Sequence, residues 1–278
     1  MSRSTPRLWR RFRRNRGGVV GLLLLMALLA AAPLAPVLAP HGPADQDLLE
    51  RLARPSPRHP LGTDDLGRDL LSRILYGARV SLLVGVVGVG IALSIGVPVG
   101  ALAGFAGGRL DQLLMRAMDV LLSFPAFLLA VAIVGIAGPS LQNALLAIGV
   151  IGIPTYARLV RATVLVVKAE PYVEAAHALG AGTGRVLVRH VLPNCAGPLL
   201  VQATLGMGTA ILEVAGLSFL GLGAQPPTPE WGAMLSSGRA WVLTAPWLLL
   251  WPGLAILLAV LGFTLVGDGL RDALASAQ

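Results

Sequence analysis

Between two long apolar stretches the chain carries the polar sequence Pro171-Tyr172-Val173-Glu174-Ala175-Ala176-His177-Ala178-Leu179-Gly180. Pro171 suits the first position of a helix, because its missing N–H would have no partner there in any case. Glu174 falls in the first turn, where a carboxylate meets the positive end of the helix dipole. Gly180 can adopt the left-handed conformation that ends a helix. The sequence therefore predicts a rod of roughly 13 Å, from about nine residues at about 1.5 Å each, which suits docking in a groove of a partner protein.

The polar segment continues to His190-Val191-Leu192-Pro193-Asn194, where the next apolar stretch begins. Thr183 is a suitable N-cap for a second short helix. A proline disfavours the helical conformation of the residue before it, so this second helix is expected to stop before Pro193. The whole polar segment is thus expected to contain two short helices.

The composition indicates an integral membrane protein. The chain has 278 residues, of which 55% are hydrophobic and only 13% are charged, whereas soluble domains carry about 25% charged residues. A membrane helix needs about 20 predominantly apolar residues. Segments that meet this requirement lie at about 18–39, 80–106, 113–137, 141–165, 196–223 and 246–267. We therefore expect an all-α protein with about six transmembrane helices.

The charges predict the orientation. The formal net charge is +8, but seven arginines lie within the first sixteen residues, and no base-reading motif accompanies them, so nucleic acid is not an expected partner. A basic segment before an apolar one is typical of the cytoplasmic side of a membrane helix. Lys and Arg in the later short loops favour the same side, which predicts that both termini and the loop 166–194 are cytoplasmic. We expect the first apolar segment to be retained; a cleaved signal peptide is the alternative.

Small residues recur every four positions along the second apolar segment. The row is Gly88, Ala92, Gly96, Gly100, Gly104 and Gly108. Small residues at this spacing form a groove that lets another helix approach closely. The row therefore predicts a tight helix–helix contact.

The expected outer loop contains His59-Pro60-Leu61-Gly62-Thr63-Asp64-Asp65-Leu66-Gly67-Arg68-Asp69. These residues predict a turn that leads into a helix capped by Asp64 or Asp65. His59 and the three aspartates offer metal ligands, but Arg68 and Arg73 supply simpler partners for the acids. No metal site is therefore expected.

The spacing of the polar segment resembles the EAA loop of the permeases of ABC importers. The shared pattern is Glu174-Ala175-Ala176, then Gly180, nine residues, His190 and Leu192-Pro193; many members have an aliphatic residue at the position of His190. The string at 59–69 and the strings Leu217-Ser218-Phe219-Leu220-Gly221-Leu222-Gly223 and Pro226-Pro227-Thr228-Pro229-Glu230-Trp231-Gly232 resemble the C-type permease subunit of dipeptide, oligopeptide and nickel importers.

The resemblance implies a type I ABC-importer permease fold with a cytoplasmic coupling helix. It divides the chain into an N-terminal part, 1–79, and a permease core, 80–278, with the coupling loop at about 166–194. The implied partners are a second permease, two ATP-binding subunits and an extracytoplasmic binding protein. Peptides are the first expected solute, with nickel or another small solute as the alternative. The residues expected to dock on the ATP-binding subunit are Pro171, Tyr172, Glu174, Ala175, Ala176, Gly180, His190, Leu192 and Pro193.

Two further residues lie within the fifth apolar segment. Glu213 is an ionisable group among apolar neighbours, where it is costly unless it faces protein or water. Glu213 and Ser218 are therefore candidates for the solute pathway or its gate; a structural hydrogen bond from Glu213 to a neighbouring helix or to a partner subunit is the alternative.

Catalytic and cofactor motifs are missing from the sequence. It has no GxxxxGK[ST] phosphate loop and no catalytic constellation within the apolar segments. We therefore expect neither a cofactor nor an enzymatic activity of the chain itself. An ion-driven carrier that acts alone and a membrane enzyme are the rival functions.

Overall fold

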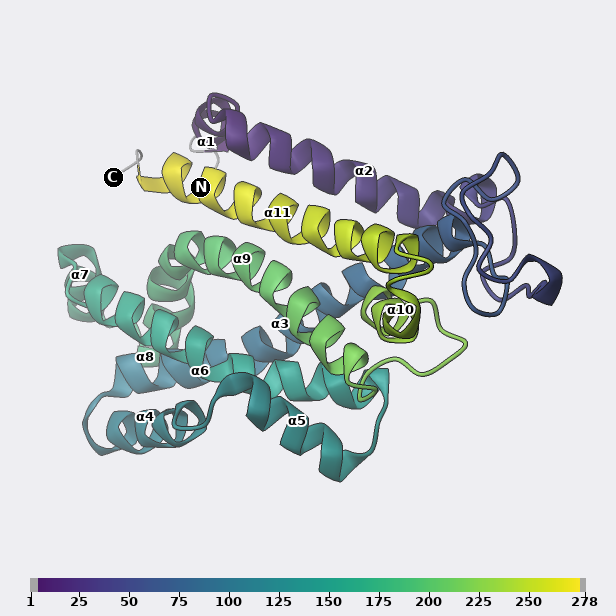
Figure 1. Ribbon diagram of the computed structural model, residues 1–278. Helices are drawn as coiled ribbons and strands as arrows, with labels where there is room; N and C mark the ends of the chain where they lie inside the picture. The colour runs from purple at the N-terminus through teal and green to yellow at the C-terminus, as the bar shows by residue number, and fades with distance from the viewer. Residues whose placement is uncertain (1–4, 276–278) are drawn as a thin grey trace.

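The computed structural model describes residues 5–275 and is nearly all helical (Figure 1). Its α-helices are α1 (Thr5–Phe12), α2 (Arg16–Leu38), α3 (Leu70–Ala106), α4 (Gly108–Leu122), α5 (Ala126–Ala137), α6 (Leu141–Lys168), α7 (Pro171–Ala178), α8 (Thr183–Val186), α9 (Leu192–Phe219), α10 (Trp231–Gly238) and α11 (Trp247–Ala275). Short 3₁₀ turns lie at Leu48–Glu50 (η1) and Arg239–Trp241 (η3), and a π-turn lies at Leu187–Val191 (η2).

Within residues 5–275, five helical segments are long and apolar enough to cross a membrane. The third expected span, 113–137, is not one straight helix. It is the pair α4 and α5, which are bent by 85° relative to each other. The bend lies at Ser123-Phe124-Pro125, because Pro125 lacks the N–H that a continuous helix would use. Six spans result if this bent pair counts as one.

The second span begins earlier than its apolar segment does. Helix α3 starts at Leu70, ten residues before the expected 80, because the Asp69 side chain accepts a hydrogen bond from the Ser72 amide and caps it. Asp69 is therefore the cap, and the expectation of Asp64 or Asp65 was wrong. Asp64 instead binds the buried Arg68 at 2.6 Å, as expected for a pairing of acids and arginines in this loop.

The row of small residues packs α3 against α6, as predicted. A Cβ added to Gly96 would lie 2.8 Å from the Ile153 carbonyl oxygen, and one added to Gly100 would overlap the carbonyl oxygen of Ala157. Gly108 is the exception to the prediction. It lies beyond the end of α3, has a φ of 59° and has no neighbour that an added Cβ would meet.

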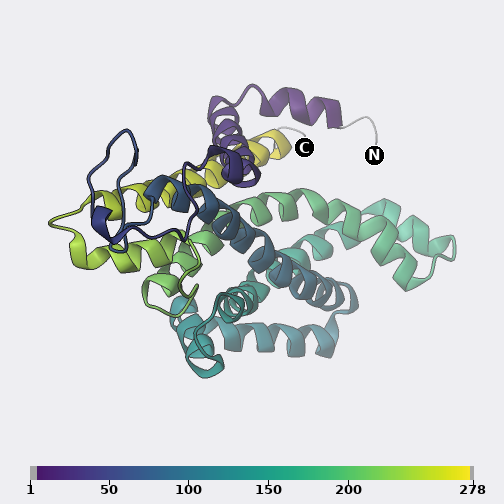
Figure 2. The same ribbon diagram turned by 90° about the vertical axis from the view of Figure 1, so that its right-hand side faces the viewer.

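Helices α2 and α11 lie side by side on one flank of the molecule, above the body formed by α3, α6 and α9 (Figures 1 and 2). Their backbones approach closely where a Cβ added to Gly21 would lie 2.9 Å from the Gly262 oxygen. Figure 1 also shows that α7 lies at the same end of the molecule as the start of α1 and the end of α11. The loop between α2 and α3 lies at the opposite end, together with α10.

Candidate functional site

Helix α7 packs against the body of the molecule through one fully buried side chain. Val173 is only 1% exposed and is the one buried residue of this helix. It packs in an apolar cluster with Val186, Val191 and Cys195. The same cluster includes residues near the ends of α3 and α6, namely Phe105, Val160, Val164 and Val167. Because an eight-residue helix has little stability of its own, this anchor determines where α7 lies.

Both ends of α7 form as the sequence predicts. Pro171 occupies the first turn, and Glu174 is its acidic residue. Gly180 follows the C-cap with a φ of 82°. The Gly180 and Ala181 amides donate to the oxygens of His177, at 2.9 Å, and Ala176, at 3.0 Å, which closes the helix as left-handed glycine caps do. Space around Gly180 is open, so its φ alone restricts which residue can stand there.

The second half of the loop differs from the expectation. Gly182, not Thr183, is the N-cap, and α8 is a single turn. The helical conformation does not end before Pro193, contrary to the expectation. It continues through the π-turn η2 directly into α9. Pro193 has no N–H to continue the α-helical bonding, and the amide of Leu192 bonds back to the oxygen of Leu187 instead. Such π-turns occur often at functional sites.

The π-turn leaves the carbonyl oxygen of His190 available to side chains. The Asn194 Nδ2 donates to it at 2.7 Å, and the Tyr172 hydroxyl lies 3.4 Å from it. Asn194 Nδ2 is also 3.0 Å from the Tyr172 hydroxyl. These contacts tie the first turn of α7 to the start of α9, beside the apolar anchor.

The structure gathers the expected docking residues at one end of the molecule, but they do not all face outward. Pro171, Tyr172, Glu174, Ala175, Gly180 and Pro193 are exposed. Ala176 and Leu192 are half-buried and pack against the cluster around Val173; His190 is half-buried. The first group therefore offers a surface, and Ala176 and Leu192 support it.

Sequence reasoning missed three apolar residues of this loop. Val173 is the anchor, while Leu179 and Val188 are 88% and 65% exposed. The sequence signal for them was weak, since the same segment also carries Val186, Leu187, Val191 and Leu192, which are buried or half-buried. An exposed Leu beside the rigid Gly180 adds apolar area to the candidate docking surface.

The two pathway candidates lie in different surroundings. Glu213 lines a cavity of about 190 Å³, together with Tyr156, Gln202 and Thr209. Glu213 is half-buried, and no hydrogen bond or ion pair links its carboxylate to the rest of residues 5–275. Ser218 lies outside this cavity; it is buried, and its hydroxyl accepts a hydrogen bond from the Ala224 amide at 3.2 Å. The cavity therefore brings Glu213, and not Ser218, toward open space.

Glu230 is a buried carboxylate to which the sequence analysis gave no role. It is 2% exposed and accepts hydrogen bonds from the amides of Gly232 and Ala233, both at 2.9 Å, as the cap of α10. Burial raises the pKa of Glu230, while hydrogen bonds, among them one from Ser218, act in the opposite direction. Ser218 thus belongs to a capping cluster at the end of α9.

Known proteins resemble the chain over nearly all of its length. It is 50% identical over 272 residues to the di/tripeptide transport system permease protein DppC of Pseudomonas aeruginosa, covering 96% of this chain and 90% of that one. It is 49% identical over 266 residues to the dipeptide transport system permease protein DppC of Alkalihalophilus pseudofirmus, covering 96% and 88%. A solved structure of the MetNI methionine ABC transporter in an inward-facing conformation has the same fold, with a TM-score of 0.62 and 20% identity over 75% of this chain and 98% of that one.

Two family profiles also match. The N-terminal TM domain of oligopeptide transport permease C matches residues 6–55, and the binding-protein-dependent transport system inner membrane component matches residues 96–277. The second match covers most of the chain, including the entire loop around α7. The chain belongs to the binding-protein-dependent transport system inner membrane components, and is a C-type permease subunit of a bacterial ABC importer.

Proposed function

We propose that this permease carries di- or tripeptides across the bacterial inner membrane, driven by ATP hydrolysis on separate subunits. The similarity to dipeptide and di/tripeptide permeases at about half identity supports the substrate class. The proposed assembly contains a second permease, two ATP-binding subunits and an extracytoplasmic binding protein that delivers the solute.

The observation that carries the proposed coupling is the geometry of α7. An exposed helix of fixed length projects at one end of the molecule, capped by Pro171 and Gly180, and is fastened to α3, α6 and α9 through Val173. A partner that displaces α7 therefore also displaces the ends of three long helices. Glu174 and Ala175 are its exposed contact residues, and Gly180 fixes its length.

The proposed orientation places α7 and both termini in the cytoplasm. The basic segment before α2, and the position of α7 at the same end of the molecule as the start of α1 and the end of α11, support it (Figure 1). The loop between α2 and α3 then faces outward. The N-terminal unit, 1–79, would pack against the core, 80–278, although α3 itself continues across that boundary.

Glu213 is the proposed polar residue of the solute pathway. Its cavity lies among α3, α6 and α9 and is open enough to admit water. A half-buried carboxylate without a partner among the described residues suits a site that meets solvent or the peptide amino group. Ser218, enclosed in the capping cluster, serves the pathway only by holding the end of α9.

Uptake of a labelled dipeptide tests this function. Cells that lack the chromosomal gene should regain uptake when the chain is supplied, and should lose it when the ATP-binding subunit is inactivated. Uptake that persists without that subunit would indicate an ion-driven carrier. Restored nickel uptake without dipeptide uptake would refute the peptide assignment and leave the importer assignment intact.

A further inference from the structure

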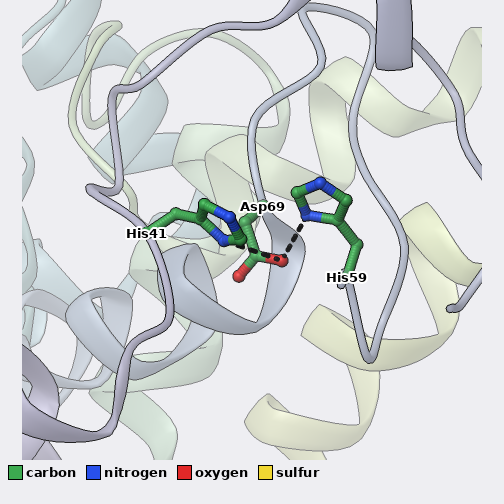
Figure 3. Close-up of side chains that lie close together, drawn as sticks. All are labelled: His41, His59 and Asp69. Atoms are coloured by element: carbon green, nitrogen blue, oxygen red, sulfur yellow. Dashed lines mark hydrogen bonds and ion pairs between the residues drawn. The ribbon is translucent and has the colours of Figure 1, made fainter. Parts of the chain in front are cut away.

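A second polar cluster lies in the loop between α2 and α3, at the opposite end from α7 (Figure 3). His41 follows α2, His59 lies within the loop, and Asp69 caps α3. Figure 3 shows both imidazole rings directed toward the Asp69 carboxylate. One ligand atom from each of the three residues lies within 4.8 Å of the other two. The sequence offered His59 and Asp69 as ligands, but His41 was not among the candidates.

The two carboxylate oxygens of Asp69 contact different groups. Oδ2 accepts hydrogen bonds from the Ser72 amide at 2.8 Å and from its hydroxyl at 2.7 Å. Oδ1 faces the imidazoles, 2.9 Å from His59 Nδ1 and 3.9 Å from His41 Nδ1. Asp64 is held by Arg68 and Arg73. Three atoms therefore converge on one point: Oδ1 and the two Nδ1 atoms.

Glu50 fixes the orientation of the His59 ring from the other side. Its Oε2 lies 2.5 Å from His59 Nε2, and its Oε1 binds Arg58. A carboxylate on the far nitrogen is the usual outer-shell partner of a metal-binding histidine, because it holds the proton away from the nitrogen that faces the metal. When Nε2–H donates to Glu50, the lone pair of Nδ1 lies on the same side as Asp69 Oδ1, so a cation between them would bind both atoms.

His41 supplies an independent observation. Its Nδ1 is buried and has no hydrogen-bond partner among residues 5–275, although the side chain as a whole is 31% exposed. Its ring stacks on His59 with centroids 4.7 Å apart and an angle of 25° between the planes. A buried polar atom without a partner is costly and needs an explanation. A cation between His41, His59 and Asp69 would satisfy it.

We infer that His41, His59 and Asp69 bind one Zn²⁺ ion, with water at the remaining position. Imidazole nitrogens suit Zn²⁺, whereas Ca²⁺ and Mg²⁺ prefer oxygen ligands only. Zinc bonds of about 2.0–2.2 Å place tetrahedral ligands roughly 3.4 Å apart. The separations of the two histidine nitrogens from Asp69 Oδ1, 2.9 and 3.9 Å, lie on either side of that value. All three ligand atoms lie within 4.8 Å of one another, so side-chain shifts of about 1 Å complete the site.

The bound ion would fasten the chain just after α2 to the first turn of α3. It would thereby hold the loop between them in its folded form. The zinc site is inferred from the loop geometry alone and does not depend on the proposed peptide transport.

Metal analysis of the purified full-length chain, in complex with its partner subunits, tests the site. The complex carries a tag without histidine, is stripped with EDTA, and is dialysed against Zn²⁺ of defined free concentration before elemental analysis. His41→Ala is the informative variant, because its Nδ1 makes no hydrogen bond and its backbone amide keeps its contact with Ser72 Oγ. His177→Ala, which alters an exposed histidine of α7, is the matched control.

The wild type and His177→Ala should each hold one Zn²⁺ that His41→Ala and His59→Ala lack. Glu50→Gln should weaken the affinity by about 10–100-fold, as expected for an outer-shell partner. X-ray absorption should show two imidazole ligands on the zinc. Equal zinc content in the wild type and His41→Ala would overturn the inference. So would an absence of tightly bound zinc from all variants.

Discussion

Replacing Val173 with Ala removes the anchor of α7 and leaves its exposed surface unchanged. Two buried methyl groups are lost, at about 0.8 kcal/mol each, and the remaining cavity brings the cost to roughly 2 kcal/mol. The surrounding residues Val186, Val191 and Cys195 are fully buried, so little solvent can fill the space. Since 1.4 kcal/mol changes an equilibrium about tenfold, the docked position of α7 should lose about 30-fold in population relative to the undocked one.

Hydrogen exchange measures this loss directly. The backbone amides within 171–181, all but Pro171, which has no N–H, should exchange about 30-fold faster in Val173→Ala if exchange proceeds by local undocking. This factor follows from roughly 2 kcal/mol, because about 1.4 kcal/mol corresponds to a tenfold change. Amides in the middle of α6 should keep their rates. In reconstituted complexes, solute-dependent stimulation of the ATPase should fall because the displaced helix no longer moves α3, α6 and α9.

Val188→Ala is the matched control for this experiment. It is the same substitution in the same loop, but Val188 is 65% exposed, and such surface changes usually alter stability by less than about 0.5 kcal/mol. If both variants changed the exchange rates of 171–181 equally, or if Val173→Ala changed neither exchange nor coupling, Val173 would not be the anchor.

Three further predictions follow from individual residues. Gly180→Val should reduce transport at equal membrane abundance, because a left-handed non-glycine residue costs about 1–2 kcal/mol. The control Gly184→Val, at a position in open space and without a positive φ, should leave transport unchanged. Similar transport by both variants would refute the role of the cap. Gly100→Ala should lower the melting temperature, since overpacking costs about 1–3 kcal/mol. The control Gly90→Ala, whose added Cβ would have no described atom within 4 Å, should leave it unchanged. Equal melting temperatures of the two variants would contradict the α3–α6 contact. Glu213→Gln should leave the melting temperature unchanged and reduce dipeptide uptake, and unchanged uptake would exclude Glu213 from the pathway.

Much of the fold could be predicted from local sequence signals. Pro171, Glu174 and Gly180 act within one or two turns of their own helix, so the ends of α7 followed from the residue types alone. The small residues from Gly88 to Gly104 likewise predicted a close helix contact, though not that α6 provides it. The lengths of the apolar segments located the membrane spans, because each segment must by itself be long enough to cross the bilayer.

The errors arose where distant or backbone interactions decide the outcome. Helices α4 and α5 are bent by 85° relative to each other at Pro125. The length of an apolar segment does not indicate whether the helix within it is straight or bent. The π-turn before α9 absorbs Pro193 by a change in hydrogen bonding that residue preferences do not indicate. His41 approaches His59 and Asp69 only through the tertiary path of the loop.

The most direct test of the account is a crosslink from α7 to the ATP-binding subunit. The single native cysteine, Cys195, is 1% exposed, so a cysteine introduced by Ala175→Cys can be labelled selectively with a photoactivatable crosslinker in native membranes. We expect a crosslink from this position to the ATP-binding subunit and none from Leu220→Cys, an exposed site at the far end of α9. Crosslinking of Ala175→Cys to the extracytoplasmic binding protein, or to no ATP-binding subunit, would contradict it.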